Sequence, residues 1–176
     1  MIFRSRVQPL SAQPPVQSVN GLENAWRLHD AQMDWTGKVD AKAAFSLTIQ
    51  SALLAAALSL LNEMDTCIEY VLIALGVLLV MAGVAFAASV VAPRLRHKHV
   101  RAETASNFIY FGHARGWSPD ALARELRQSD LMDQVARQVV VMADIAWEKH
   151  RRVAWSIWLA VSGGGLLLAA GVVSKL

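Results

Sequence analysis

Three uncharged apolar stretches dominate this chain, and each is long enough to cross a lipid bilayer. They occupy residues 43–61, 70–93 and 153–174, and the third span is taken to continue to residue 176. A helix rises about 1.5 Å per residue, so about 19 residues reach about 28 Å, close to a hydrocarbon core of roughly 30 Å. The sequence therefore predicts an all-α membrane protein with three transmembrane spans, and it excludes most classes of soluble enzyme.

The charged residues between the spans indicate how the chain is oriented. Of the 17 lysines and arginines, five lie in residues 1–42 and eleven in residues 94–152, whereas the short loop between the first two spans has none and is acidic. Cytoplasmic loops of membrane proteins carry the excess of basic residues. We therefore expect the N-terminus and residues 94–152 to be cytoplasmic, and the acidic loop and the C-terminus to lie outside.

Composition divides the chain into segments. Residues 1–20 are proline-rich and predicted to be a disordered leader, and residues 21–42 are predicted to form a cytosolic helical stalk. Residues 43–93 are predicted to form a transmembrane hairpin, residues 94–152 a cytosolic sensor or effector segment, and residues 153–176 the third span. From Leu131 to Ser162 there is no proline or glycine, so we expect one helix to join the cytosolic domain to this span.

Small residues recur four positions apart in all three spans. Such faces allow helix backbones to approach closely within lipid, where no hydrophobic force drives helices together. Three helices in one chain can cover only some of these faces, so we expect the protein to form a homo-oligomer. The residues are Ser51, Ala55 and Ser59, Ala52 and Ala56, Gly83 and Ala87, Ala160 and Gly164, and Gly165 and Ala169.

Motifs that carry catalysis or bind metals are absent from the sequence: it has no glycine-rich phosphate loop, HExxH, CxxC or nucleophile elbow. His97 and His99, two positions apart, would point to different faces of a helix, and we interpret them as interfacial basic residues. The single cysteine, Cys67, falls in the exterior loop and is either an inert thiol or half of a disulfide between two chains. We expect no enzymatic activity, no metal and no cofactor.

Three polar residues in or beside the first span are candidates for gating or assembly. Gln50 lies within the span, where it either makes an interhelical hydrogen bond or lines a polar path. Asp40 and Lys42 are two positions apart and do not face each other on a helix. Lys42 can extend to the interface, whereas Asp40 needs a donor. Asp40 is therefore either in a charge pair with another helix or in a contact that serves gating or assembly.

Basic, amide and aromatic side chains of residues 94–152 are candidates for binding a small anion. The fork of an arginine binds two phosphate oxygens at once, and aromatic rings stack on bases. Acidic residues are interspersed among them, so the alternative is that most of these arginines are solvated or paired. The candidate ligand-binding residues are Tyr110, His113, Arg115, Arg124, Gln134 and Arg137.

Three groups of residues, taken in order, carry a resemblance to a known family. They are Trp35 with Asp40-x-Lys42-Ala43 ahead of a small-residue span, Pro93 followed by Ile109-Tyr110-Phe111-Gly112, and Gln138, Asp144-Ile145-Ala146 and Glu148-Lys149 in the long last helix. Over roughly residues 22–172 the chain resembles the transmembrane effectors of Pycsar, a bacterial antiphage system in which a pyrimidine cyclase makes a cyclic mononucleotide.

The resemblance implies a function. Cyclic UMP or cyclic CMP, made by a cognate cyclase, would bind the cytosolic part as the activating ligand. The effector would then assemble or rearrange in the bacterial inner membrane, impair its integrity and cause growth arrest or cell death. Its partners would be the lipid bilayer, further copies of itself and the cyclic nucleotide, and no nucleic acid is expected.

Other function classes remain open from the sequence. One is a membrane scaffold whose basic segment recruits a partner protein. Another is a related two-span effector of a defence system that responds to a different nucleotide second messenger. Capture of a partner protein would identify a scaffold. Identification of the bound messenger would distinguish the related two-span effector.

Overall fold

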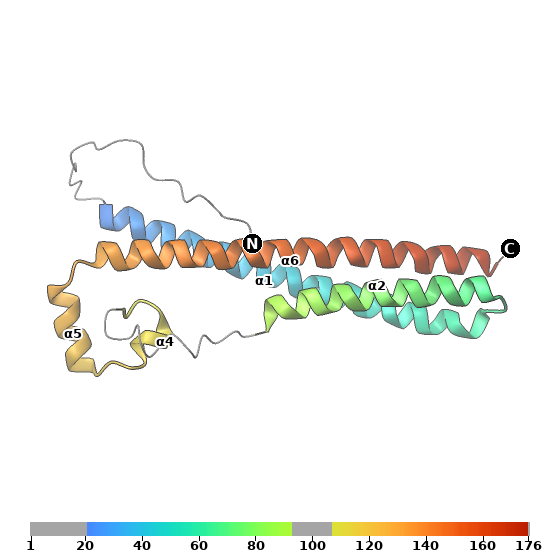
Figure 1. The fold of residues 1–176 in the computed structure, drawn as a ribbon, viewed down its shortest axis with the longest axis horizontal. Coiled ribbons are helices and arrows are strands. Elements are labelled where there is room, and N and C mark those ends of the chain that lie inside the picture. Colours follow the sequence, from blue (N-terminus) through green and yellow to red (C-terminus); the bar gives the residue numbers. More distant parts are fainter. Residues whose placement is uncertain (1–20, 93–106, 176) are drawn as a thin grey trace, which may run out of the picture.

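The computed structural model describes residues 21–92 and 107–175, and these residues are largely helical (Figure 1). The expected leader 1–20, Pro93 and the basic run that includes His97 and His99 lie outside the described residues. Within the described residues there are no strands, and three helices are long and apolar enough to cross a membrane. The predicted all-α fold with three transmembrane spans is confirmed.

The two longest helices each join a polar segment to a span without a break. The first has 40 residues and the last has 43. We use the term bundle for α2 together with residues 43–60 and 153–173, and the term stem for residues 21–42 and 131–152. The elements are α1 (Gly21–Leu60), the 3₁₀ turn η1 (Leu61–Glu63), α2 (Cys67–Val91), α4 (Phe111–Ala114), α5 (Pro119–Gln128) and α6 (Leu131–Val173).

Helix α2 begins at Cys67, three residues before the apolar stretch that starts at residue 70, because a capping box fixes its first turn. The Thr66 hydroxyl accepts a hydrogen bond from the Glu69 backbone N–H (3.4 Å). The Glu69 carboxylate in turn accepts from the backbone N–H groups of Asp65 (2.9 Å) and Thr66 (3.2 Å). These bonds satisfy N–H groups that a helix start otherwise leaves unpaired. Cys67, expected in the loop, is therefore the first helical residue and is exposed.

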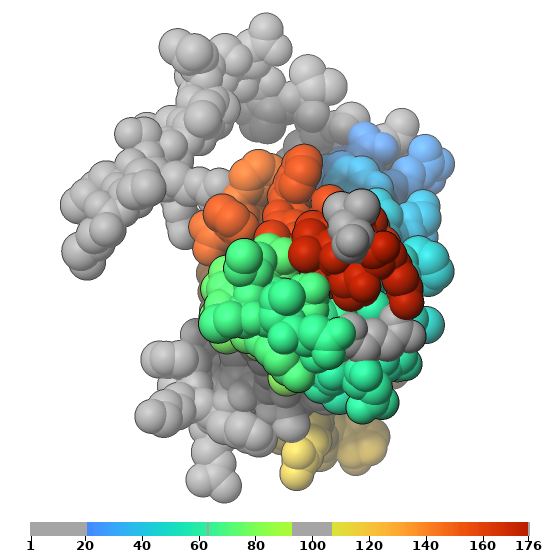
Figure 2. All heavy atoms as spheres, turned by 90° about the vertical axis from the view of Figure 1, so that its right-hand side faces the viewer, coloured from blue at the N-terminus to red at the C-terminus, as the bar shows by residue number. Residues whose placement is uncertain are grey.

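The three helices of the bundle pack along stripes with alternating spacings of three and four residues. This spacing is that of a left-handed coiled coil, in which the same face of each helix stays turned toward its neighbours. Seen from the end that carries the α1–α2 connection, the helices lie around a common axis (Figure 2). The buried residues of α2 on this stripe are Glu69, Ile73, Gly76, Val80, Gly83, Ala87 and Val90.

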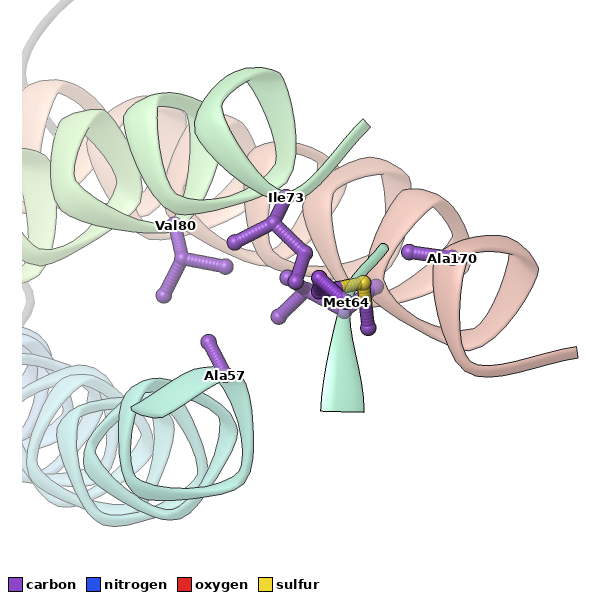
Figure 3. Packing of buried hydrophobic residues seen from close by; sticks show 6 residues of the cluster. Ala57, Met64, Ile73, Val80 and Ala170 are labelled. Atoms are coloured by element: carbon purple, nitrogen blue, oxygen red, sulfur yellow. The ribbon is translucent and has the colours of Figure 1, made fainter. Parts of the chain in front are cut away.

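Small and medium-sized apolar side chains fill the inside of the bundle near the α1–α2 connection (Figure 3). Large apolar side chains instead face outward: Leu58 and Trp158 are each 68% exposed and Leu168 is 74% exposed. A water-soluble bundle would have the opposite distribution. Outward-facing apolar side chains with small residues between the helices are typical of proteins whose surroundings are lipid.

Helices α2 and α6 approach each other closely at two glycines. A Cβ atom on Gly163 would lie 2.7 Å from the Gly76 carbonyl oxygen, and one on Gly76 would lie 3.0 Å from the Gly163 carbonyl oxygen. No side chain fits between backbones at this separation. The predicted small faces at Gly83 and Ala87 and at Ala160 and Gly164 also lie inside the bundle, whereas Gly165 and Ala169 are exposed.

Two short helices lie beside the stem (Figure 1). Ser118 caps α5, its hydroxyl accepting from the Ala121 N–H (3.3 Å), and Pro119 occupies the first helical position, where no backbone N–H is needed. Asp130 caps α6 by accepting from the Met132 N–H (2.9 Å). Neither α4 nor α5 packs extensively against α1, α2 or α6.

Candidate functional site

An ion pair joins the two helices of the stem just outside the bundle. Lys149 Nζ on α6 lies 2.7 Å and 2.8 Å from the two carboxylate oxygens of Asp40 on α1. The pair stands beside the buried residues Val39, Ala43 and Val153, where the bundle begins. Asp40 thus finds its donor on another helix, which is the charge-pair alternative from the sequence. Its proposed role in gating stays a prediction.

Lys42, the second charged candidate at this level, is exposed. Its spacing from Asp40 places it on another face of α1, as expected for residues two positions apart. Among the residues that the structure describes, Lys42 makes no hydrogen bond or ion pair, and its part in assembly stays a prediction.

A second polar contact between α1 and α6 lies inside the apolar bundle. Gln50 Nε2 donates to the hydroxyl oxygens of Ser156 (2.8 Å) and Ser46 (3.1 Å), and the two hydroxyls are 3.2 Å apart. Gln50 and Ser156 are completely buried, and Ser46 is nearly so. We call these three residues the polar cluster. The interhelical hydrogen bond is therefore the alternative that the structure supports for Gln50.

Helix α2 closes the third side of the polar cluster with a glycine. A Cβ atom on Gly83 would lie 3.0 Å from Gln50 Nε2 and 3.0 Å from the Ser156 carbonyl oxygen. The glycine therefore leaves just enough room for the amide. Gln50 Oε1 is buried and has no hydrogen-bond partner among the described residues. An unpaired acceptor in an apolar bundle carries a desolvation cost, which reduces the net stabilisation that the hydrogen bonds of the polar cluster give.

Replacing Gln50 by leucine is expected to lower the free energy of unfolding of the bundle by about 1 kcal/mol, the size of an interhelical hydrogen bond in a membrane. Ser156→Ala should have a similar effect. Because the two residues share their strongest bond, the double variant should lose less than the sum of the single losses. Titration with a denaturing detergent, followed by tryptophan fluorescence, measures the three values.

The matched control for this cycle is Thr48→Ala on the same helix. The Thr48 hydroxyl is exposed and donates only to the Ala44 carbonyl oxygen of its own helix (3.3 Å). Its loss should change stability little and should be additive with Ser156→Ala. Additive losses for Gln50 and Ser156 would mean that the polar cluster does not couple α1 to α6.

The predicted ligand-binding residues lie on three different elements. Tyr110 and His113 are in contact at the start of α4, with ring centroids 5.4 Å apart and nearly perpendicular rings. Arg115 follows α4 and is exposed, and Arg124 is exposed on α5. Because α4 and α5 do not pack extensively against the stem, these residues are not joined into one site with those on α6.

Gln134 and Arg137 lie near the start of α6. Arg137 is exposed, whereas Gln134 is half-buried and its Oε1 atom is buried without a hydrogen-bond partner among the described residues. The neighbouring Val135 is completely buried. In the structure, the Tyr110–His113 pair and Gln134 therefore do not form one site. The predicted nucleotide-binding site stays a prediction.

A comparison with protein-family models decides the family. The model described as the Pycsar effector protein domain matches residues 24–174, almost the whole described chain. The chain belongs to the Pycsar effector family. No curated protein and no solved structure matched it. The resemblance inferred from the sequence is therefore confirmed at the level of the family.

Two polar contacts of this Pycsar effector lie outside the residues predicted from the sequence. Ser46 and Ser156 are not among the predicted site residues, although each lies on the same three–four stripe as the buried residues around it. Lys149 belongs to one of the motifs that carry the family resemblance, but the motif does not identify its partner. The available signal was a polar residue recurring at heptad positions within or beside an apolar stretch.

Proposed function

We propose that this Pycsar effector senses a cyclic pyrimidine mononucleotide, cyclic UMP or cyclic CMP, and in response impairs the bacterial inner membrane. It does so without catalysis. Membership of the family supports the defence role, and three apolar helices support action at a membrane. The observation that carries the mechanism is that α1 and α6 each run unbroken from the stem into the bundle.

Because these two helices are continuous, a movement of the stem is transmitted to the bundle. At about 1.5 Å per residue, α6 is about 65 Å long, so a small tilt at its free end displaces the segment within the membrane. Ligand binding at the stem or at α4–α5 would move α6 relative to α1. The Asp40–Lys149 ion pair and the polar cluster lie between these two helices and resist that movement.

Assembly of several copies is part of the proposal. Helix α1 has an outer face of small residues that the single chain leaves uncovered. Contact between such faces lets helices pack closely in lipid and allows several subunits to share the cost of activation. Moving a population from 1:99 to 99:1 takes about 5.5 kcal/mol of differential binding. The exposed small residues of this face are Ser51, Ala52, Ala55, Ala56 and Ser59.

The proposal requires the stem to face the cytoplasm, and the native cysteine tests this. Cys67 is exposed at the opposite end of the bundle. In spheroplasts a membrane-impermeant maleimide should label Cys67. In a Cys67→Ser background, Gln128→Cys, exposed at the end of α5, should react only after the membrane is permeabilised. The reverse labelling pattern would contradict the orientation.

The defence function is tested in bacteria that express the chain together with an active pyrimidine cyclase. We expect membrane depolarisation, uptake of propidium iodide and growth arrest. The matched control is the same cyclase with an inactivated catalytic site, with which cells should grow normally. Normal growth and intact membranes with the active cyclase would overturn the proposal, and a captured partner protein would then favour a scaffold.

A further inference from the structure

A pocket of about 460 Å³ lies between α2 and α6 where the bundle meets the stem. Figure 1 shows the C-terminal end of α2 lying beside the middle of α6 at this level. Volumes of this size accommodate small ligands and headgroups. Its lining includes Ala85 and Phe86 from α2, and Glu148, Arg151, Arg152 and Trp155 from α6.

One wall of the pocket carries a net positive charge. Glu148 holds both arginines: its Oε2 lies 2.7 Å from Arg151 Nη2, and its Oε1 accepts from Arg152 Nε at 2.9 Å. The hydrogen bond from Arg152 lowers the pKa of the Glu148 carboxyl group, so this group is ionised at neutral pH. One carboxylate fixes two guanidinium groups, each of which has five N–H donors. Donors therefore remain for a second anion.

The other wall is apolar and exposed at the surface of the bundle. Trp155 is 56% exposed and Phe86 is 39% exposed. Trp155 is one of the tryptophans at the start of the third span, a position where tryptophan typically marks the membrane interface. The pocket thus has cationic donors on its stem side and aromatic surface on its bundle side.

We propose that this pocket binds the phosphate headgroup of an anionic phospholipid. The phosphate would accept from the Arg151 and Arg152 guanidinium groups, whose fork geometry suits phosphate oxygens. The first part of an acyl chain would lie along Phe86 and Trp155. Basic pockets between transmembrane helices commonly bind anionic lipid headgroups. A lipid held there contacts both α2 and α6 and so stabilises their contact.

Cyclic nucleotides also contain a phosphodiester anion, so the same donors could bind either a lipid headgroup or a cyclic nucleotide. The observations favour a lipid, because the aromatic wall lies on outward-facing surface at the edge of the bundle rather than in a site enclosed by the stem. A general attraction between a basic surface and anionic lipid is a different explanation, because it depends on charge and not on the shape of the pocket.

The test uses the full chain in detergent and native mass spectrometry with added phosphatidylglycerol or phosphatidylcholine. The wild type should retain phosphatidylglycerol in preference to phosphatidylcholine. The double variant Arg151→Gln/Arg152→Gln should weaken phosphatidylglycerol binding at least tenfold. Ala85→Leu, which fills the pocket without changing its charge, should weaken it to a similar degree.

Ala88→Leu is the matched control, because Ala88 is also exposed on α2 but does not line the pocket. It should bind phosphatidylglycerol like the wild type. If Ala85→Leu and Ala88→Leu bind phosphatidylglycerol equally, the pocket is not the binding site. The lipid would then be held only by general attraction to the basic surface. Displacement of bound phosphatidylglycerol by micromolar cyclic UMP or cyclic CMP would overturn the assignment to lipid.

Discussion

Replacing Gly163 by alanine is expected to lower the free energy of unfolding of the bundle by about 2 kcal/mol. The added Cβ would lie 2.7 Å from the Gly76 carbonyl oxygen and 2.8 Å from a methyl group of Val80. The first of these atoms belongs to the α2 backbone and cannot rotate away. Helices α2 and α6 must therefore separate, and they lose dispersion contacts along the interface. Denaturing-detergent titration measures the loss.

The control for this substitution is Gly171→Ala, later in the same helix. A Cβ on Gly171 would make an ordinary contact with Leu60 Cδ2 at 3.4 Å. Its effect should stay within about 0.5 kcal/mol. If both alanine variants lose the same stability, the close approach at Gly163 does not hold the bundle together.

Replacing Lys149 by alanine is expected to make the effector about tenfold more sensitive to cyclic nucleotide. The Lys149 and Asp40 side chains are 23% and 39% exposed. Exposed ion pairs contribute about 0.2–1 kcal/mol, and breaking a fully buried pair costs about 3–5 kcal/mol. A partly exposed pair between helices falls between these, at about 1.4 kcal/mol, which is a factor of ten in an equilibrium constant. Dye uptake against nucleotide concentration measures the shift.

Two further variants make this prediction specific to the contact between helices. The exchange Asp40→Lys/Lys149→Asp should restore normal sensitivity, because it restores the pair. Lys38→Ala removes an exposed pair with Asp34 that lies within α1 and should leave sensitivity unchanged. If Lys149→Ala and Lys38→Ala behave alike, the ion pair does not hold the resting arrangement.

The spans and several helix starts could be predicted from the sequence because their causes are local. A bilayer requires long uncharged helices, so composition alone locates them. The caps at Ser118 and Asp130 depend on a side chain and the first turn that follows it. The start of α2 at Cys67 does not follow from the hydropathy boundary at residue 70, because it is set by the reciprocal bonds of Thr66 and Glu69.

The contacts of the candidate site could not be predicted, because they depend on how helices far apart in the chain align. Nothing local to Asp40 identifies Lys149 as its partner, and nothing local to Gln50 identifies Ser156. The pocket between α2 and α6 likewise exists only once these helices lie side by side. Among the predicted ligand-binding residues, Tyr110 and His113 are three positions apart on one turn, and theirs is the ring contact that the structure shows.

The proposed function requires that a cyclic pyrimidine nucleotide is sufficient to make this chain breach a bilayer. The direct measurement is dye release from liposomes that contain the purified, folded protein. Release is predicted when cyclic UMP or cyclic CMP is added, but not with cyclic AMP or with empty liposomes. Retention of the dye with both pyrimidine nucleotides would contradict the account.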